Sequence, residues 1–217
     1  MAARKARGTG TTARGRPAKA PAGPAPAALG AQIATRIDEL AAVTDEPGRL
    51  TRLYLGPAHK KAAGLVMHWM REAGMTARLD AAGSVVGRYE GLRPGAPALL
   101  LGSHIDSVRD AGKFDGNLGV LAAIAVVGGL DAQARRFEFA IEVVAFGDEE
   151  GVRFASTLGG SRALAGRFEP QALDEADAAG ITRRQALIAF GCDPARIGEE
   201  SRVPGKALGY VELHIEQ

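Results

Sequence analysis

Imidazole and carboxylate side chains follow three apolar runs of this chain, over residues 98–103, 137–147 and 210–213. In chain order they are His104, Asp106, Asp115, Glu149, Glu150 and His214. Such groups are costly to place at the ends of buried strands unless a partner compensates them, and a metal ion is the usual partner. Nitrogen and oxygen ligands without sulfur suit Zn²⁺, Mn²⁺, Co²⁺ or Ni²⁺. The sequence therefore predicts a divalent-metal site.

Each of these residues also has an ordinary interpretation. His104 would be a hydrogen-bonded histidine at a strand end, and Asp115 would cap a helix or form a turn. The Glu149–Glu150 pair would be a solvated loop, and His214 would pack within the last strand. Ligands of open α/β sheets gather outside the carboxyl ends of the strands. His104, Glu149 and Glu150 lie just past such ends. His214 lies within the last expected strand and Asp115 begins an expected buried helix, and together these placements favour a shared site.

The same residues could carry out hydrolysis. A bridging carboxylate can hold two ions about 3.5–4 Å apart, where a shared water becomes hydroxide-like near neutral pH. A neighbouring carboxylate that is not a ligand can take the proton of that water. In an extended chain, Glu149 and Glu150 would point to opposite sides, one toward the metal and one toward the substrate. Asp106 would lie on the side of His104 and orient its imidazole.

The charge of the chain is unevenly distributed. Residues 1–28 hold six of the 27 basic residues and no acid, so residues 29–217 carry 21 basic against 25 acidic side chains. We predict a disordered, basic tail rich in Ala, Pro and Gly over residues 1–28, followed by a mildly acidic body. This balance argues against a nucleic-acid partner.

The single cysteine, Cys192, excludes an internal disulfide and a thiolate metal cluster. This usage is consistent with a reducing compartment, and we expect a cytoplasmic protein. No apolar stretch approaches the ~20 residues that span a bilayer, and the basic start lacks the apolar segment of a secretory signal. The nucleotide-binding patterns GxGxxG and GxxxxGK[ST] are absent.

Apolar spacing predicts a helix-covered, mixed α/β sheet. Helices are expected from about Ala28 to Val43, and over 57–73, 116–130, 161–164 and part of 171–190. Strands are expected over 76–80, 84–90, 98–103, 137–147 and 210–217. The two histidines of the second helix, His59 and His68, are interpreted as ordinary surface or packing residues.

Four ordered motifs, SHID, GKFDG, FGDEEGVRF with GSRAL, and ELHIEQ, resemble the hydantoinase/carbamoylase branch of the dinuclear-metal amidohydrolases, which is related to zinc aminopeptidases. The resemblance runs from about Ile33 to Gln217. It implies metal-dependent hydrolysis of a C–N bond in a ureido substrate. Wider relatives carry an acidic ligand where this chain has His214. The sequences of these motifs are most similar to those of allantoate amidohydrolases of purine degradation. N-carbamoyl-L-amino acid hydrolase and β-ureidopropionase are the alternatives.

The resemblance also implies residue roles. His104 and His214 would bind one divalent ion and Glu150 a second, with Asp115 bridging them. The ions would be Zn²⁺ or Mn²⁺, with Co²⁺ or Ni²⁺ as alternatives. Glu149 would be the general base, Asp106 would orient His104, and Gln217 would lie beside the substrate. The family also tends to have a cis peptide after the bridging aspartate, here Asp115–Gly116.

The implied fold is a three-layer helix–sheet–helix catalytic domain of the zinc-aminopeptidase kind. Relatives continue into a lid and dimerisation domain, form homodimers, and return with a further histidine ligand. We therefore expect residues 29–217 to be the N-terminal part of that domain, with exposed apolar sheet edges and little or no activity alone.

Two other functions stay open. A non-catalytic, metal-binding remnant is the alternative of a different class, and a zinc titration beside an activity assay separates it from an enzyme. An aminopeptidase or deacylase of the wider family is the other, and His214 argues against it.

Overall fold

Strand β4 (Ala140–Phe146) lies at the middle of a five-stranded sheet, and all of its residues are buried. The computed structural model describes residues 25–215. The strand order is β1–β2–β4–β3–β5, with β1 at Thr76–Leu79, β2 at Val85–Tyr89, β3 at Ala98–His104 and β5 at Ala207–Glu212. Strands β3, β4 and β5 run parallel, whereas β1 and β2 pair antiparallel. The predicted mixed sheet is confirmed.

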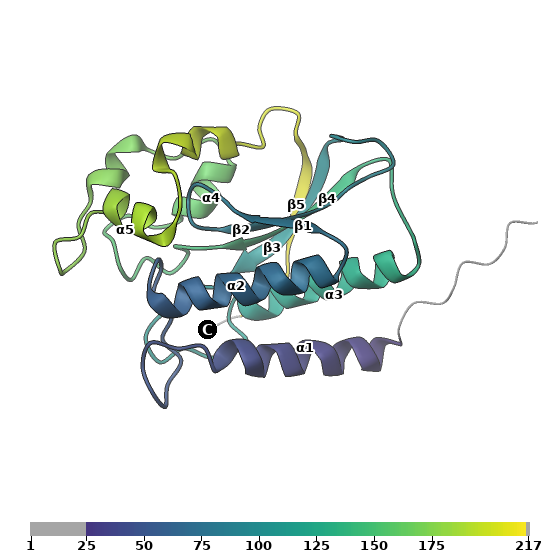
Figure 1. Cartoon of the computed structure of the whole chain (residues 1–217), viewed down its shortest axis with the longest axis horizontal. Coiled ribbons are helices and arrows are strands. Elements are labelled where there is room, and N and C mark those ends of the chain that lie inside the picture. The colour runs from purple at the N-terminus through teal and green to yellow at the C-terminus, as the bar shows by residue number, and fades with distance from the viewer. Residues whose placement is uncertain (1–24, 216–217) are drawn as a thin grey trace, which may run out of the picture.

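Three long helices lie on one side of the sheet (Figure 1). Helix α2 (Pro57–Glu72) packs on β1 and β2, and α3 (Asn117–Ala132) packs on β3 and β4. Helix α1 (Pro26–Ala41) packs on α3. Their apolar stripes form one large core with the sheet. Pro57 in the first turn of α2 suits a position that needs no backbone donor.

Shorter helices cover part of the other face, which makes the three layers. They are α4 (Gly159–Leu164), α5 (Arg183–Phe190) and the 3₁₀ helices η1 (Pro170–Asp174) and η2 (Pro194–Glu200). Leu164 of α4 packs with Leu100, Val144 and Phe146 in a small second core. Strand β5 is an edge strand with Leu208 and Val211 more than half exposed. An exposed apolar edge was expected.

The ends of the described chain refine the sequence predictions. Pro26 already starts α1, two residues before the predicted end of the tail, and the rest of that predicted tail, residues 1–24, lies outside the described residues. Strand β5 ends at Glu212, so the prediction that His214 lies within the last strand is wrong. Leu213 turns toward α3, where its carbonyl lies against Gly119 and leaves no room for a Cβ. This turn directs the chain toward the start of α3.

Within the described residues, no helix combines the length and the apolar character needed to cross a membrane. His59 on α2 is fully buried, whereas His68 on the same helix is exposed. The His59 ring stacks on Phe190, and its Nδ1 accepts the N–H of Leu55 at 2.9 Å. Burial first, and then the charges of Arg52 and Arg153, lower the pKa of His59 to about 3.

We predict that His59 makes the free energy of unfolding fall with acidification. The unfolded histidine takes up a proton near pH 6.5, but the folded one does so only near pH 3. The stabilisation is therefore complete above pH 6.5 and is lost as the pH falls toward 3, by at most about 1.4 kcal/mol per pH unit. Urea unfolding between pH 7.5 and 5 should give a shallower slope for His59→Asn than for the wild type. His68→Asn is the matched control, and equal slopes in all three proteins would contradict the prediction.

Candidate metal centre

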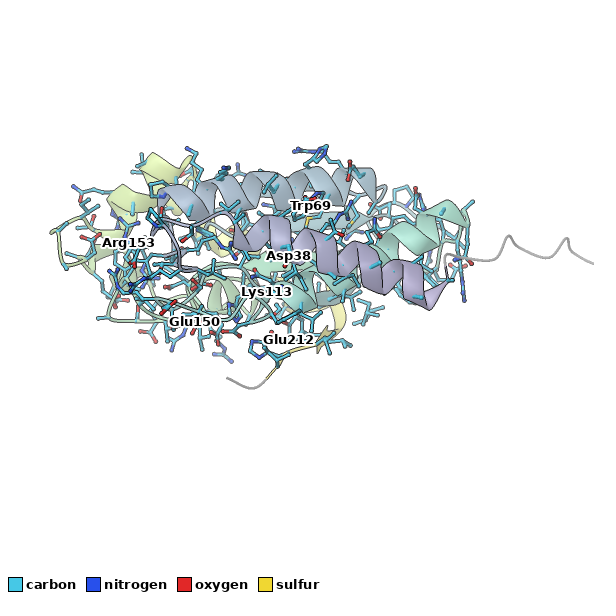
Figure 2. All side chains as sticks on the ribbon, turned by 90° about the horizontal axis from the view of Figure 1, so that it is seen from below. Asp38, Trp69, Lys113, Glu150, Arg153 and Glu212 are labelled. Atoms are coloured by element: carbon cyan, nitrogen blue, oxygen red, sulfur yellow. The ribbon has the colours of Figure 1, made fainter. Side chains whose placement is uncertain are left out.

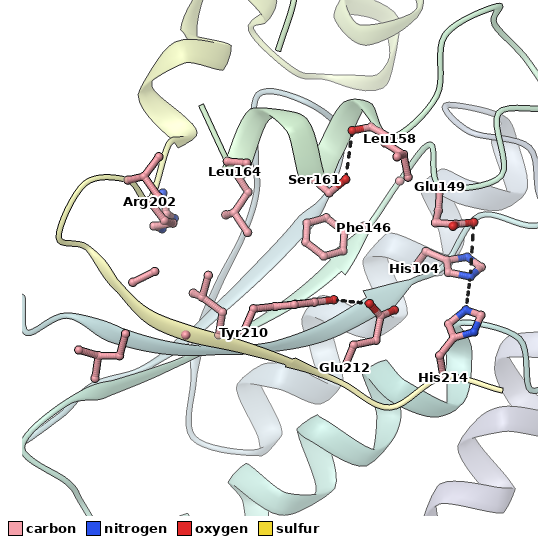
Figure 3. Close-up of a pocket in the computed structure, with 17 residues that line it drawn as sticks. His104, Phe146, Glu149, Leu158, Ser161, Leu164, Arg202, Tyr210, Glu212 and His214 are labelled. Atoms are coloured by element: carbon pink, nitrogen blue, oxygen red, sulfur yellow. Dashed lines mark hydrogen bonds and ion pairs between the residues drawn. The ribbon is translucent and has the colours of Figure 1, made fainter. Parts of the chain in front are cut away.

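Three parallel strands deliver the candidate residues to one edge of the sheet (Figure 3). His104 is the last residue of β3, and the turn Asp148–Glu150 follows β4. His214 follows β5 by two residues. Asp115 immediately precedes Gly116, the N-cap of α3. Segments far apart in sequence thus meet where the carboxyl ends of the strands lie side by side, as expected for a parallel arrangement.

The two histidines face each other through their ring Nε2 atoms, which lie 3.0 Å apart. His104 Nδ1 is 3.0 Å from the carbonyl oxygen of Asp106, and His214 Nδ1 is 2.6 Å from that of Ile215. A carbonyl oxygen can only accept, so each Nδ1 carries the hydrogen. In the neutral rings the two Nε2 lone pairs therefore point at each other. That arrangement is repulsive unless a positive charge lies between them.

Asp115 completes a three-residue cluster. Its Oδ1 lies 3.6 Å from His104 Nε2 and 3.3 Å from His214 Nε2. The Asp115 side chain is buried, and neither carboxylate oxygen has a hydrogen-bond partner. A tetrahedral Zn²⁺ with bonds of about 2.0–2.1 Å places its ligand atoms roughly 3.3–3.4 Å apart. The distances and the unpartnered carboxylate fit a divalent ion bound by His104, Asp115 and His214.

Glycine at position 116 allows this close packing. Gly116 has φ +62°, and a Cβ there would lie 2.7 Å from the carbons Cδ2 and Cε1 of the His104 ring. The predicted cis peptide at Asp115–Gly116 is wrong, because the cis peptide bond of the described residues is Val203–Pro204. The positive φ of Gly116 makes the turn into α3 without a cis bond.

The turn that carries Glu149 and Glu150 is a bend rather than an extended strand. The division of the two glutamates between metal and substrate stays a prediction. Asp148 has φ +67°, and one carboxylate oxygen of each glutamate lies with a His104 nitrogen in a group whose members are within 4.8 Å of one another. Glu149 Oε2 is 3.9 Å from His104 Nε2. Glu150 Oε1 accepts the Val108 N–H at 3.3 Å. Both glutamates therefore lie near His104 at the carboxyl ends of the parallel strands, which we call the metal-centre edge.

Asp106 acts differently from the prediction. Its backbone carbonyl, rather than its carboxylate, contacts His104 Nδ1; the carboxylate Oδ1 is 3.7 Å away. The Asp106 carboxylate instead accepts the backbone N–H groups of Glu149 and Glu150, both at 3.2 Å. Asp106 thus connects β3 to the glutamate turn. Burial raises the pKa of this carboxyl.

Electrostatics at the glutamate turn favour cation binding. Burial first, and also the charge of Asp115, raise the pKa of Glu150 to about 7, although His104 acts in the opposite direction. Acidic groups crowded at one edge repel one another, and a divalent ion turns that cost into binding energy.

A cavity of about 820 Å³ opens beside the metal-centre edge, between α4 and β5. Figure 3 shows His104, Glu149 and His214 at one end and Arg202 toward the other. Its other walls include the apolar side chains of Leu158, Leu164, Leu208 and Phe146. Glu149 lines this cavity, whereas Glu150 does not. Gln217, predicted to lie beside the substrate, falls outside the described residues.

Sequence reasoning missed a buried arginine that supports the metal-centre edge. Arg52 is fully buried and donates to the carbonyls of Leu40 and Ile105, at 2.7 and 2.5 Å, and to Asn117 Oδ1 at 2.7 Å. It therefore joins the end of α1, the residue after β3 and the start of α3. Arg52 belongs to no motif and its spacing carries no signal, so only the fold reveals its role.

The comparisons with known proteins agree with this geometry. The family model of Peptidase family M28 matches residues 84–201. This range is more than half of the chain and contains all the candidate residues except His214 and Gln217. The chain belongs to Peptidase family M28.

The matched relatives are amidohydrolases. The chain is 46% identical over 189 residues to N-carbamoyl-L-amino acid amidohydrolase of Geobacillus stearothermophilus, covering 87% of this chain and 46% of the relative. It is 41% identical to allantoate deiminase of Arabidopsis thaliana, covering 86% of this chain and 36% of the relative. A crystal structure of a hydantoinase/carbamoylase family amidase from Burkholderia ambifaria matches with a TM-score of 0.74 and 34% identity. That match covers 86% of this chain and 45% of the amidase.

The chain thus spans less than half the length of these relatives. The resemblance to the hydantoinase/carbamoylase branch and the three-layer fold class are confirmed by these matches. The relatives support divalent-metal use by the family. The individual roles of the site residues stay predictions.

We predict that Gly116→Ala disrupts the metal centre. The added Cβ would meet the His104 ring and carbonyl, and alanine is strained at φ +62°. The free energy of unfolding should fall by about 1–3 kcal/mol, and the Zn²⁺ affinity should fall at least about tenfold, or ~1.4 kcal/mol. Gly112→Ala is the matched control, because a Cβ at position 112 meets nothing within 4 Å. Equal effects of the two substitutions on urea unfolding and zinc calorimetry would contradict this prediction.

Proposed function

We propose that this chain carries the metal-binding and proton-transfer residues of a site that hydrolyses a C–N bond in ureido substrates. The observation that carries the proposal is the cluster of two opposed histidine nitrogens and the buried, unpartnered Asp115 carboxylate. The names of the matched relatives support the ureido substrate class.

In this proposal His104, His214 and Asp115 would hold one divalent ion, and Glu150 together with Asp115 would hold a second. Zn²⁺ and Mn²⁺ are the proposed ions, because the ligand atoms are nitrogen and oxygen. Bound ions would supply Lewis acidity, which lowers the pKa of a water molecule toward neutrality. The Asp106 carboxylate accepts a backbone N–H of the glutamate turn. The carbonyls of Asp106 and Ile215 accept the Nδ1–H groups of His104 and His214, and these bonds fix the tautomers of the two rings.

Glu149 is the proposed general base, because it faces the cavity and its side chain is 43% exposed. It accepts a proton from the water that attacks the ureido carbonyl carbon. The C–N bond to the leaving nitrogen then breaks, and Glu149 passes the proton to that nitrogen. The carbamate product decomposes to ammonia and carbon dioxide.

We predict that the chain binds one Zn²⁺ tightly and a second more weakly, because the first ion has three protein ligands and the second has two. Asp115→Asn keeps the shape of the side chain but removes its charge, and it should weaken the tight site at least about a hundredfold, or ~2.7 kcal/mol. Asp110→Asn, an exposed position in the same loop, is the control. Calorimetry decides: zinc binding that is unchanged in Asp115→Asn, or absent from the wild type, would reject the proposed centre.

The catalytic role of Glu149 is best measured in a chimera, because the chain spans less than half the length of its relatives. Residues of this chain replace the matching 189 residues of the Geobacillus stearothermophilus relative. With Mn²⁺, the chimera should release ammonia from an N-carbamoyl-L-amino acid or from allantoate. Glu149→Gln should lower kcat by about 10²–10⁴ while metal binding persists. We expect the 217-residue chain alone to be far slower.

Two results would contradict the role of Glu149. A Glu149→Gln chimera with full activity would remove it as the base. A well-folded, metal-loaded chimera without activity on either substrate would favour a non-catalytic, metal-binding function for this chain. The ratio of the rates on the two substrates chooses between the allantoate and N-carbamoyl amino acid alternatives. A cytoplasmic location and homodimerisation of a full-length protein are further proposals, which localisation imaging and light scattering test.

A further inference from the structure

A buried ion pair also contacts the glutamate turn, at Asp148. Arg183, the first residue of α5, is 1% exposed, and Asp148 is fully buried. The Arg183 Nη1 contacts Asp148 Oδ2, and this oxygen also accepts the N–H of Gly159 at 3.3 Å. The two charged residues are 35 positions apart in the sequence. The pair thus connects α5 to the residue immediately before Glu149.

The guanidinium of Arg183 also holds the loop that follows the turn. Its Nη2 donates to the carbonyl of Ser156 at 2.7 Å and approaches Glu175 Oε2 at 3.2 Å. The guanidinium also lies over the ring of Phe154, with the arginine Cζ 4.6 Å from the ring centroid. One side chain therefore fastens Asp148 and Ser156, which lie on either side of Glu149 and Glu150.

The surroundings leave Asp148 dependent on this arginine. Its Oδ1 is buried without a hydrogen-bond partner, so Arg183 is the cation that compensates the carboxylate. Gly159 permits the contact, because a Cβ there would lie 2.8 Å from Asp148 Oδ2 and 2.9 Å from Arg183 Nη1. A buried carboxylate that loses its cation must move or become protonated. Either change would reach the next residue, Glu149.

We propose that Arg183 is a positioning residue for Glu149 and Glu150, acting through Asp148. Asp106 accepts the backbone N–H groups of the two glutamates, and Arg183 contacts the carboxylate of Asp148, the residue before them. The turn is therefore fixed between two charged side chains. The consequence for metal binding depends on the proposed function, but the effect on the turn itself does not.

Amide hydrogen exchange in the metal-free chain measures the turn directly. In Arg183→Met, the amides of Glu149 and Glu150 should exchange at least tenfold faster than in the wild type, while amides of β4 keep their rates. Arg184→Met is the matched control, because Arg184 is the next residue of α5 and pairs with the exposed Asp174 instead. Arg183→Lys should restore part of the protection. If Arg183→Met does not fold, Arg183→Lys compared with Arg184→Lys decides the question.

A double-mutant cycle tests the route through Asp148. Arg183→Met should have little further effect on these amides in an Asp148→Asn background. Unchanged glutamate amides, or acceleration spread equally over β4, would overturn the positioning role and leave a general stabilising one. Co²⁺ titration followed by visible absorption adds a second readout, in which Arg183→Met should weaken the second equivalent and spare the first. Absence of Co²⁺ binding in the wild type would reject the proposed function, while the exchange result would still decide on Arg183.

Discussion

Two imidazoles whose Nε2 atoms lie 3.0 Å apart, beside a buried carboxylate without a hydrogen-bond partner, are stabilised by a positive charge among them. The arrangement of the surrounding elements follows from this constraint. Strands β3 and β5 must run parallel so that His104 and His214 reach the same edge. Gly116 and Gly119 must lack side chains so that α3 can approach His104 and Leu213. The fold thus brings costly groups together where a cation would stabilise them.

Charged residues away from the metal centre are compensated by protein partners instead. The carboxylate of Glu142, buried in the middle of β4, pairs with Arg88 at 3.0 Å and with Arg202 at 2.7 Å. Arg52 donates to backbone carbonyls and to Asn117. In contrast to these residues, Asp115 has no such partner. This difference supports the metal-binding interpretation of Asp115.

The sequence predicted the elements well because apolar periodicity reports local burial. Helix α2 was predicted over 57–73 and observed at Pro57–Glu72, and the continuous apolar run of residues 98–103 became the covered strand β3. The approach of His104 to the Glu149–Glu150 turn was also predictable, since both follow parallel strands whose carboxyl ends share an edge. The four ordered motifs indicate the family from the sequence alone.

Contacts set by tertiary structure were not predictable in this way. The departure of the chain from β5 before His214 depends on where α3 lies. The curled glutamate turn depends on Asp106 and on Arg183, which lies 35 residues beyond Asp148. Sequence spacing carries no signal for an ion pair of that separation. The side chains that support the metal-centre edge, Asp106 and Arg183, could therefore be identified only from the three-dimensional structure.

Anomalous diffraction at the zinc edge, from crystals of the chain grown with Zn²⁺, would locate the bound metal. We expect one strong peak about 2.0–2.2 Å from the two Nε2 atoms and an Asp115 oxygen. A peak elsewhere on the molecule, with His104, Asp115 and His214 free of metal, would contradict it.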